Sequence, residues 1–131
     1  MEPQKNCKPG EREKTILVIE SEESIRTLLA EELSEEGDLV ITTADGSDAL
    51  AIIEKNHQKL DLVITDLKHQ GLDGMKLLAK IKKHWPELPV IFYTAYGAFV
   101  DTFLAWGPDA VVIKDADLDY LKKTVKKFLN S

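Results

Sequence analysis

Short runs of apolar residues alternate with longer amphipathic segments along this chain. Five of these runs are rich in β-branched residues and apolar on consecutive positions, a pattern typical of strands covered on both faces. The predicted strands are Thr15–Ile19, Leu39–Thr43, Leu62–Thr65, Val90–Thr94 and Ala110–Ile113. The alternation of strands and helices requires right-handed crossovers. It therefore predicts an α/β fold: a doubly wound, five-stranded parallel sheet with helices on both faces.

The segments between the strands have the spacing of amphipathic helices. The first is marked by Ile25, Leu28, Leu29 and Leu33, with Gly37 placed to end it. The later ones are marked by Leu50 and Ile53, by Leu78, Ile81 and Trp85 before Pro86, and by Leu118, Leu121, Val125 and Phe128. Each predicted helix therefore has one apolar face that can cover the sheet.

Length and composition limit the classes of protein that fit. The 131 residues suit a single domain, here placed at 14–131 after a polar tail at 1–13. The net charge of −6 argues against a nucleic-acid partner. No apolar stretch approaches the roughly 20 residues needed to cross a membrane. Because Cys7 is the sole cysteine, no intramolecular disulfide can form, and we expect a cytoplasmic protein.

The third predicted strand ends on Asp66, just before a turn and a helix. In open parallel sheets, ligands and chemistry gather at the carboxyl ends of the strands. A carboxylate in this place is a candidate nucleophile or cation ligand, although an aspartate after a strand can also serve only to cap a helix or a turn. The remaining strand ends decide between these interpretations.

Three further strand ends carry polar side chains: Glu20 follows the first strand, Thr94 ends the fourth and Lys114 follows the fifth. In a doubly wound sheet the first, third, fourth and fifth strands are neighbours, so these side chains can converge on Asp66. An acid, a nucleophilic carboxylate, a hydroxyl and an ammonium suit phosphoryl transfer to Asp66, with a divalent cation and Lys114 neutralising the phosphoryl oxygens.

Several short motifs occur in an order and spacing that resemble a known family. They are ILVIE at 16–20, ADG at 44–46, DLVITD at 61–66, LDG at 72–74, PVI at 89–91 and TAYG at 94–97. Together they resemble the receiver domain of two-component response regulators over nearly the whole chain. The resemblance implies a flavodoxin-like strand order 2-1-3-4-5.

The resemblance also implies a function. Asp66 would accept a phosphoryl group from a phosphohistidine on a sensor histidine kinase or phosphotransfer protein, with Mg²⁺ as cofactor. Mg²⁺ would be bound by Glu20, Asp66 and the backbone carbonyl of Lys68, and the phosphate would be contacted by Thr94, Ala95 and Lys114. The expected protein is a single-domain signalling protein rather than an enzyme, acting on an unidentified downstream protein.

Three positions depart from the family pattern. Ser21 replaces the second acid of the usual pair, so we expect weaker Mg²⁺ binding, and we interpret Ser21 as the N-cap of the first helix instead. Asp115 replaces a proline that follows a cis bond, and a non-proline cis bond costs about 2.5–4 kcal/mol, which favours trans. Val111 replaces an aromatic residue that reports phosphorylation. The segment between Thr94 and Gly107 is also short and apolar, which predicts a short or irregular fourth helix.

Other classes fit poorly. A flavodoxin needs a phosphate-binding loop after the first strand, where this chain is acidic, and a P-loop hydrolase needs a glycine-rich motif that is absent. A haloacid dehalogenase phosphatase needs a second aspartate at the position of Lys68. Two interpretations stay open. One is a working phosphoacceptor, and the other is a degenerate receiver that binds a partner, or a second copy of itself, regardless of phosphate.

Overall fold

A computed structural model of the protein describes residues 13–67, 71–115 and 117–130. Its central sheet consists of β1 (Thr15–Ile19), β2 (Leu39–Thr43), β3 (Leu62–Thr65), β4 (Val90–Thr94) and β5 (Ala110–Ile113). All four pairings are parallel and the strand order is β2-β1-β3-β4-β5. The five predicted strands and the 2-1-3-4-5 order are thus confirmed.

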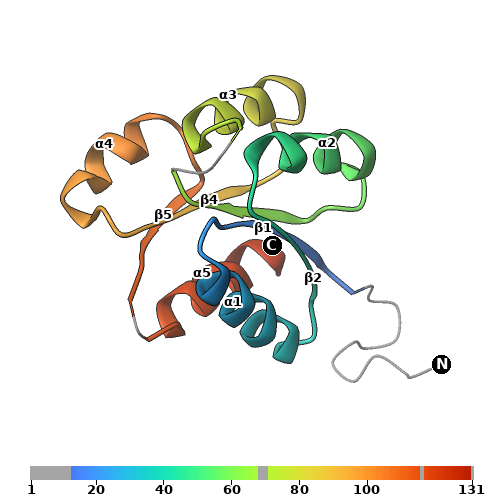
Figure 1. Ribbon diagram of the computed structural model, residues 1–131, viewed down its shortest axis with the longest axis vertical. Coiled ribbons are helices and arrows are strands. Elements are labelled where there is room, and N and C mark those ends of the chain that lie inside the picture. The colour runs from blue at the N-terminus through green and yellow to red at the C-terminus, as the bar shows by residue number, and fades with distance from the viewer. Residues whose placement is uncertain (1–12, 68–70, 116, 131) are drawn as a thin grey trace.

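Helices cover both faces of this sheet (Figure 1). They are α1 (Glu23–Glu35), α2 (Gly46–Asn56), α3 (Gly74–His84), the 3₁₀ turn η1 (Gly97–Phe99) with α4 (Val100–Ala105), and α5 (Asp119–Leu129). Helices α1 and α5 pack on one face of the sheet, and α2, α3 and α4 pack on the other. Within the described residues, none of the helices has the length and apolar character needed to cross a membrane.

The strands differ in how completely they are covered. Every residue of β1, β3 and β4 is buried, as consecutive apolar positions predict. The outer strands β2 and β5 are partly exposed because each has a neighbouring strand on one side only. The site described below therefore lies at the end of a fully buried centre formed by β1, β3 and β4.

Two predictions about the helices are confirmed, and a third is wrong. Gly37 adopts a φ of 96° just after α1, and the predicted short, irregular fourth helix is confirmed by η1 and α4. The expectation that Ser21 caps α1 is wrong. The N-cap residue is Glu22, and it makes no side-chain capping bond. The backbone N–H of Glu22 donates instead to Oε2 of Glu20, so the helix begins after the turn that this bond closes.

The loop from β3 to α3 passes very close to itself at Gly74. A Cβ atom at this position would lie 2.4 Å from the carbonyl oxygen of Asp66 and 2.9 Å from Cα of Leu67. The backbone N–H of Gly74 donates to the Leu67 carbonyl at 2.8 Å, and Asp73 caps α3 by accepting from the N–H of Lys76. Glycine is therefore required here for the start of α3 to lie against the backbone of Asp66.

Candidate functional site

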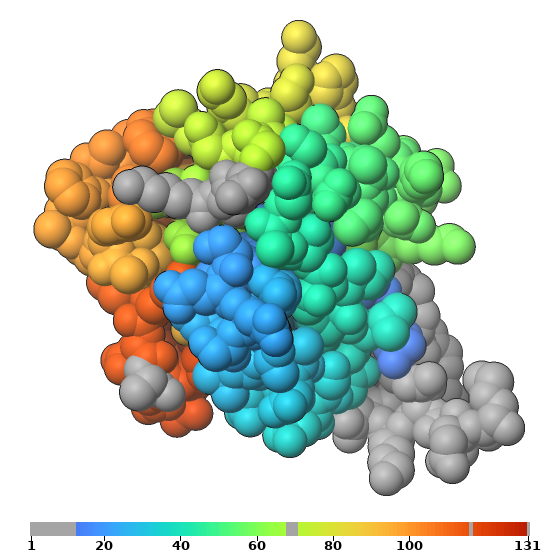
Figure 2. Space-filling model, viewed as in Figure 1, coloured from blue at the N-terminus to red at the C-terminus, as the bar shows by residue number. Residues whose placement is uncertain are grey.

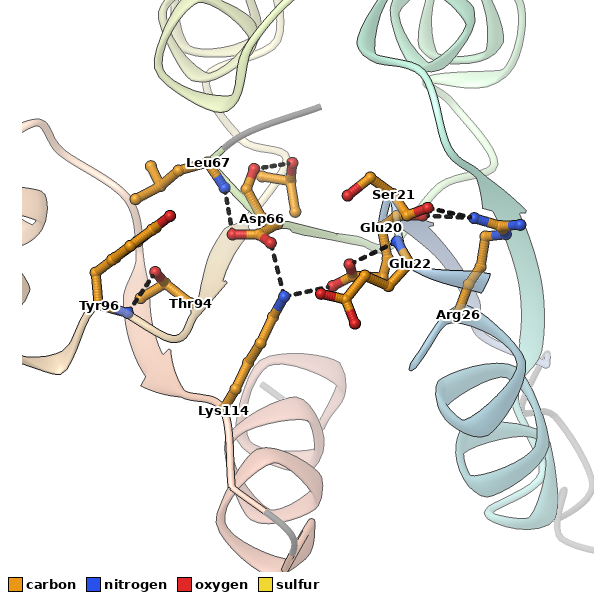
Figure 3. Close-up of polar contacts among 10 residues, drawn as sticks. Glu20, Ser21, Glu22, Arg26, Asp66, Leu67, Thr94, Tyr96 and Lys114 are labelled. Atoms are coloured by element: carbon orange, nitrogen blue, oxygen red, sulfur yellow. Dashed lines mark hydrogen bonds and ion pairs between the residues drawn. The ribbon is translucent and has the colours of Figure 1, made fainter. Parts of the chain in front are cut away.

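Three charged side chains from separate strand ends meet at the carboxyl edge of the sheet. Nζ of Lys114, directly after β5, lies 2.6 Å from Oδ2 of Asp66 and 2.8 Å from Oε1 of Glu20. Figure 3 shows the lysine side chain reaching between the two carboxylates. Two acids and one base leave a net negative charge at the centre of the cluster, which favours binding of a further cation.

The backbone on both sides of Asp66 fixes its position. Its N–H donates to the carbonyl of Ile19 at 3.2 Å, which continues the pairing of β3 with β1. Its Oδ1 accepts a hydrogen bond from the N–H of Leu67 at 2.7 Å, while Oδ2 contacts Lys114. The side chain is 13% exposed, so its carboxylate is oriented by the protein but still accessible.

Glu20 is almost completely buried, with a relative exposure of 1%. Its Oε2 accepts from the N–H of Glu22, whereas Oε1 has only the ionic contact with Lys114, without the geometry of a hydrogen bond. A buried carboxylate oxygen that lacks a hydrogen-bond donor is a natural ligand for a hard cation. This oxygen supports a divalent cation between Glu20 and Asp66.

The described residues supply two acidic ligands for such a cation rather than a full cage. No group of three or more His, Cys, Asp or Glu side chains suited to a metal gathers within the described ranges. Mg²⁺ is commonly bound through one or two carboxylates while keeping several waters, so Glu20 and Asp66 fit it. Lys68, whose carbonyl was the third expected ligand, lies outside the described residues.

The neighbours of Lys114 keep its ammonium protonated. Burial on its own lowers the pKa of this ammonium, but the close contacts with the Asp66 and Glu20 carboxylates and their negative charges outweigh burial and raise the pKa above its ordinary value. Nζ also lies 5.8 Å from the centre of the Tyr93 ring, within the range of a cation–π contact. Lys114 is therefore a fixed cation at neutral pH.

Arg26, on the first turn of α1, is a positioning residue that sequence analysis did not identify. Its Nη1 donates to the carbonyl of Glu20 at 2.8 Å and lies 3.4 Å from the carbonyl of Ser21. The guanidinium therefore holds the loop that carries the Glu20 carboxylate (Figure 3). The sequence does contain a feature that could have identified this role: an arginine in the first turn of a helix that follows an acidic loop.

Thr94 and Ala95 lie at the end of β4, beside Asp66. Thr94 is fully buried, and its hydroxyl accepts a hydrogen bond from the N–H of Tyr96 at 3.1 Å. Its carbonyl accepts from the N–H of Lys114 at 2.7 Å, which fixes the start of the lysine relative to β4. Ala95 is exposed. The structure thus brings Glu20, Asp66 and Lys114 into contact, whereas the hydroxyl of Thr94 is turned toward the loop before η1 (Figure 3).

Two of the three departures from the family pattern, Ser21 and Asp115, directly follow the cluster residues Glu20 and Lys114 in the sequence. Ser21 is exposed next to Glu20, and Val111 is half-buried on β5, opposite Phe92 of β4. The bond from Lys114 to Asp115 is trans, as expected, since no peptide bond among the described residues is cis.

Comparisons with known proteins agree with this geometry. Residues 16–126 match the family model of the response regulator receiver domain. Sporulation initiation phosphotransferase F of Bacillus subtilis is 34% identical over 116 residues, which cover 87% of this chain and 92% of that protein. The transcriptional regulatory protein GlrR of Escherichia coli is 35% identical over 112 residues, 84% of this chain, but the match spans only a quarter of GlrR.

Solved structures give the same result. The response regulator TrrA of Thermotoga maritima, crystallised in complex with Mg²⁺-BeF, superposes with a TM-score of 0.82 at 37% identity. The alignment covers 88% of this chain and 99% of TrrA. TrrA in complex with the histidine kinase ThkA superposes with a TM-score of 0.81, over 88% of this chain and 98% of that one. With the family model covering most of its length, this chain belongs to the response regulator receiver domain family of two-component signalling.

Proposed function

We propose that Asp66 accepts a phosphoryl group from a phosphohistidine of a sensor histidine kinase or phosphotransfer protein. The observation that carries this proposal is the contact of Lys114 with the carboxylates of Asp66 and Glu20 at the carboxyl end of the sheet. A relative, TrrA, forms a complex with a histidine kinase, which supports a kinase as the partner here. We place this activity in the cytoplasm.

The reaction needs little covalent chemistry from the protein. A carboxylate oxygen of Asp66 forms a bond to phosphorus as the phosphorus–nitrogen bond of the phosphohistidine breaks, and the electron pair leaves with the imidazole, which takes up a proton from solvent. Lys114 stabilises the negative charge on the phosphoryl oxygens. Ala95 contacts the transferred group, and so does Thr94 once its hydroxyl has turned away from the N–H of Tyr96. Positioning and charge stabilisation account for most of such catalysis. The protein acts as a phosphorylated signalling module and not as an enzyme with a separate substrate.

Mg²⁺ bound by Glu20, Asp66 and the carbonyl of Lys68 would neutralise charge on the phosphoryl group. The buried Oε1 of Glu20, whose contact with Lys114 is ionic and lacks the geometry of a hydrogen bond, supports this assignment. A hydroxyl at Ser21 contributes no negative charge, so this Mg²⁺ site is weaker than one with two adjacent acids.

A second candidate function is a degenerate receiver that binds its partner regardless of phosphate. Ser21 weakens the cation site, and Val111 lacks the ring of the usual aromatic. The exposed side chains of Phe99, Leu104 and Trp106 favour this alternative, because they offer an apolar surface to a downstream protein or a second copy of this chain.

Incubation with acetyl phosphate separates the two functions. With Mg²⁺ present, intact mass should increase by one phosphoryl group, and chelation of Mg²⁺ should abolish the increase. Asp66→Asn should block it, whereas Asp101→Asn, the same change at an exposed aspartate of α4, should not. If wild-type protein stays unmodified at all Mg²⁺ concentrations while its fold is intact, the phosphoacceptor proposal is wrong and the binding module is favoured.

A further inference from the structure

A cavity of about 350 Å³ lies next to the Asp66 loop, between α3 and the segment of η1 and α4. Its lining residues are Leu67, Asp73, Met75, Tyr96, Phe99, Phe103 and Trp106, and we call it the aromatic pocket. In Figure 2 the surface of α4, in orange, lies on the outside of the molecule.

The rings of the pocket form a connected framework. The centroids of Phe103 and Trp106 are 5.2 Å apart, those of Phe99 and Phe103 are 6.2 Å apart, and Trp106 meets the buried Phe92 edge-on at 6.5 Å. Contacts of this kind stabilise the arrangement of the rings. The buried Phe92 and Phe103 therefore anchor a wall whose outer rings remain available to a ligand.

Several side chains that line the aromatic pocket are exposed to solvent. Exposure is 43% for Tyr96, 56% for Phe99, 41% for Trp106 and 43% for Met75. Helix α4 turns Phe103 toward the sheet, whereas its Leu104 lies on the outside and is 46% exposed. The exposed apolar residues around the pocket are of the kind that marks a binding site for another protein.

The charges at the aromatic pocket indicate which chemical group would bind there. Among the described residues that line the pocket, Asp73 is the one that carries a charge. Asp66, the neighbour of Leu67, belongs to a cluster with net negative charge. Aromatic faces attract cations, and a carboxylate beside them strengthens this preference. Arginine suits the combination best, because its planar guanidinium stacks on rings and can pair with a carboxylate through two hydrogen bonds.

We propose that the aromatic pocket binds an arginine side chain from an apolar segment of a partner protein. The guanidinium would lie on the rings and pair with Asp73, while apolar neighbours of the arginine would cover Phe99 and Leu104. This interaction does not involve phosphoryl transfer. Its test uses unphosphorylated protein, so its outcome is independent of the function proposed for Asp66.

The test is an NMR titration with the peptide acetyl-Leu-Arg-Leu-amide. The indole N–H of Trp106 reports on the pocket, and that of Trp85, which follows α3 before β4 begins, serves as an internal reference. We expect saturable shifts of Trp106 and Tyr96 and little change at Trp85. In the matched peptide, citrulline replaces arginine and removes the charge while keeping the shape. It should bind about three- to tenfold more weakly.

Two variants test the carboxylate. Asp73→Asn removes the charge but keeps a good N-cap for α3, and it should weaken binding of the arginine peptide about three- to tenfold. Asp101→Asn makes the same change on α4 outside the pocket and should change the affinity less than about twofold. Equal binding of the two peptides, equal effects of the two variants, or no saturable shift would overturn the proposal. Shifts at Trp106 that follow protein concentration without peptide would identify a second copy as the occupant and overturn it as well.

Discussion

The ammonium of Lys114 lies 2.6 Å from a carboxylate oxygen of Asp66, although the two residues are 48 positions apart in the sequence. The same ammonium contacts Glu20 at 2.8 Å. One cation therefore balances two carboxylates that would otherwise repel each other at the sheet edge. This relationship stabilises the site, and it also bears on the phosphoryl transfer that we propose for Asp66.

Replacing Lys114 by methionine should lower the free energy of unfolding by about 1–3 kcal/mol at pH 7, because it leaves two largely buried carboxylates without a counter-ion. Urea denaturation measures this loss. Lys123→Met, which removes an exposed lysine of α5, is the matched control and should change stability by less than about 0.5 kcal/mol. Equal losses in the two variants would contradict the assigned role of Lys114.

From neutral pH upward, the stabilisation by Lys114 should be lost only in alkali. Burial lowers its pKa, but contacts with Asp66 and Glu20 outweigh burial, so the folded-state pKa is raised. The contribution is therefore complete below the unfolded-state pKa of about 10.4 and is lost as the pH rises through the folded-state pKa. The difference in unfolding free energy between wild type and Lys114→Met should stay constant from about pH 7 to pH 10 and shrink above that range. A decrease already between pH 7 and pH 9 would contradict the raised pKa.

Much of the fold could be predicted from the sequence, because buried parallel strands and amphipathic helices leave periodic patterns. The bounds of all five strands were predicted correctly, and so was the irregular segment around Phe99 and Val100. Convergence of Glu20, Asp66 and Lys114 could be predicted as well, since the carboxyl ends of neighbouring parallel strands must lie at one edge.

Other features depend on contacts that no periodicity encodes. The start of α1 is set by the hydrogen bond from the Glu22 N–H to Glu20. For this reason the N-cap is Glu22 rather than Ser21, the residue predicted from the sequence. The direction of the Thr94 hydroxyl depends on the N–H of Tyr96, two residues later. The role of Arg26 depends on backbone carbonyls, which carry no signature in the amino-acid sequence.

Gly74→Ala should destabilise the protein by about 1–3 kcal/mol, because its Cβ would lie 2.4 Å from the carbonyl oxygen of Asp66 and force the loop to move. The control is Gly97→Ala, where the nearest atom is the end of the Ile113 side chain at 3.1 Å, which can shift at little cost. Thermal unfolding of both variants measures the difference. If the two variants melt at the same temperature, the close approach at Gly74 is not a constraint.

Ser21→Asp should tighten Mg²⁺ binding, since it adds a negative charge next to Glu20 and restores the usual acidic pair. The expected gain is about tenfold, equivalent to roughly 1.4 kcal/mol. Titration followed by NMR measures the affinity. Ser47→Asp adds the same charge in the first turn of α2, and it should leave Mg²⁺ binding nearly unchanged. Unchanged affinity in Ser21→Asp would show that Ser21 does not limit the cation site.

Phosphorylation of Asp66 should alter the surface of α4 and β5 only slightly. A modification shifts a conformational equilibrium only by its differential interaction with the two states, and Val111 lacks the ring that would supply one such difference. Amide spectra with and without Mg²⁺ and beryllofluoride, the combination bound by TrrA, should therefore differ around Asp66 but little at Leu104 and Ile113. Val111→Tyr should enlarge the response there. Large shifts at Leu104 and Ile113 in the wild type, or loss of partner binding in folded Asp66→Ala, would show that phosphate still controls this surface through another route.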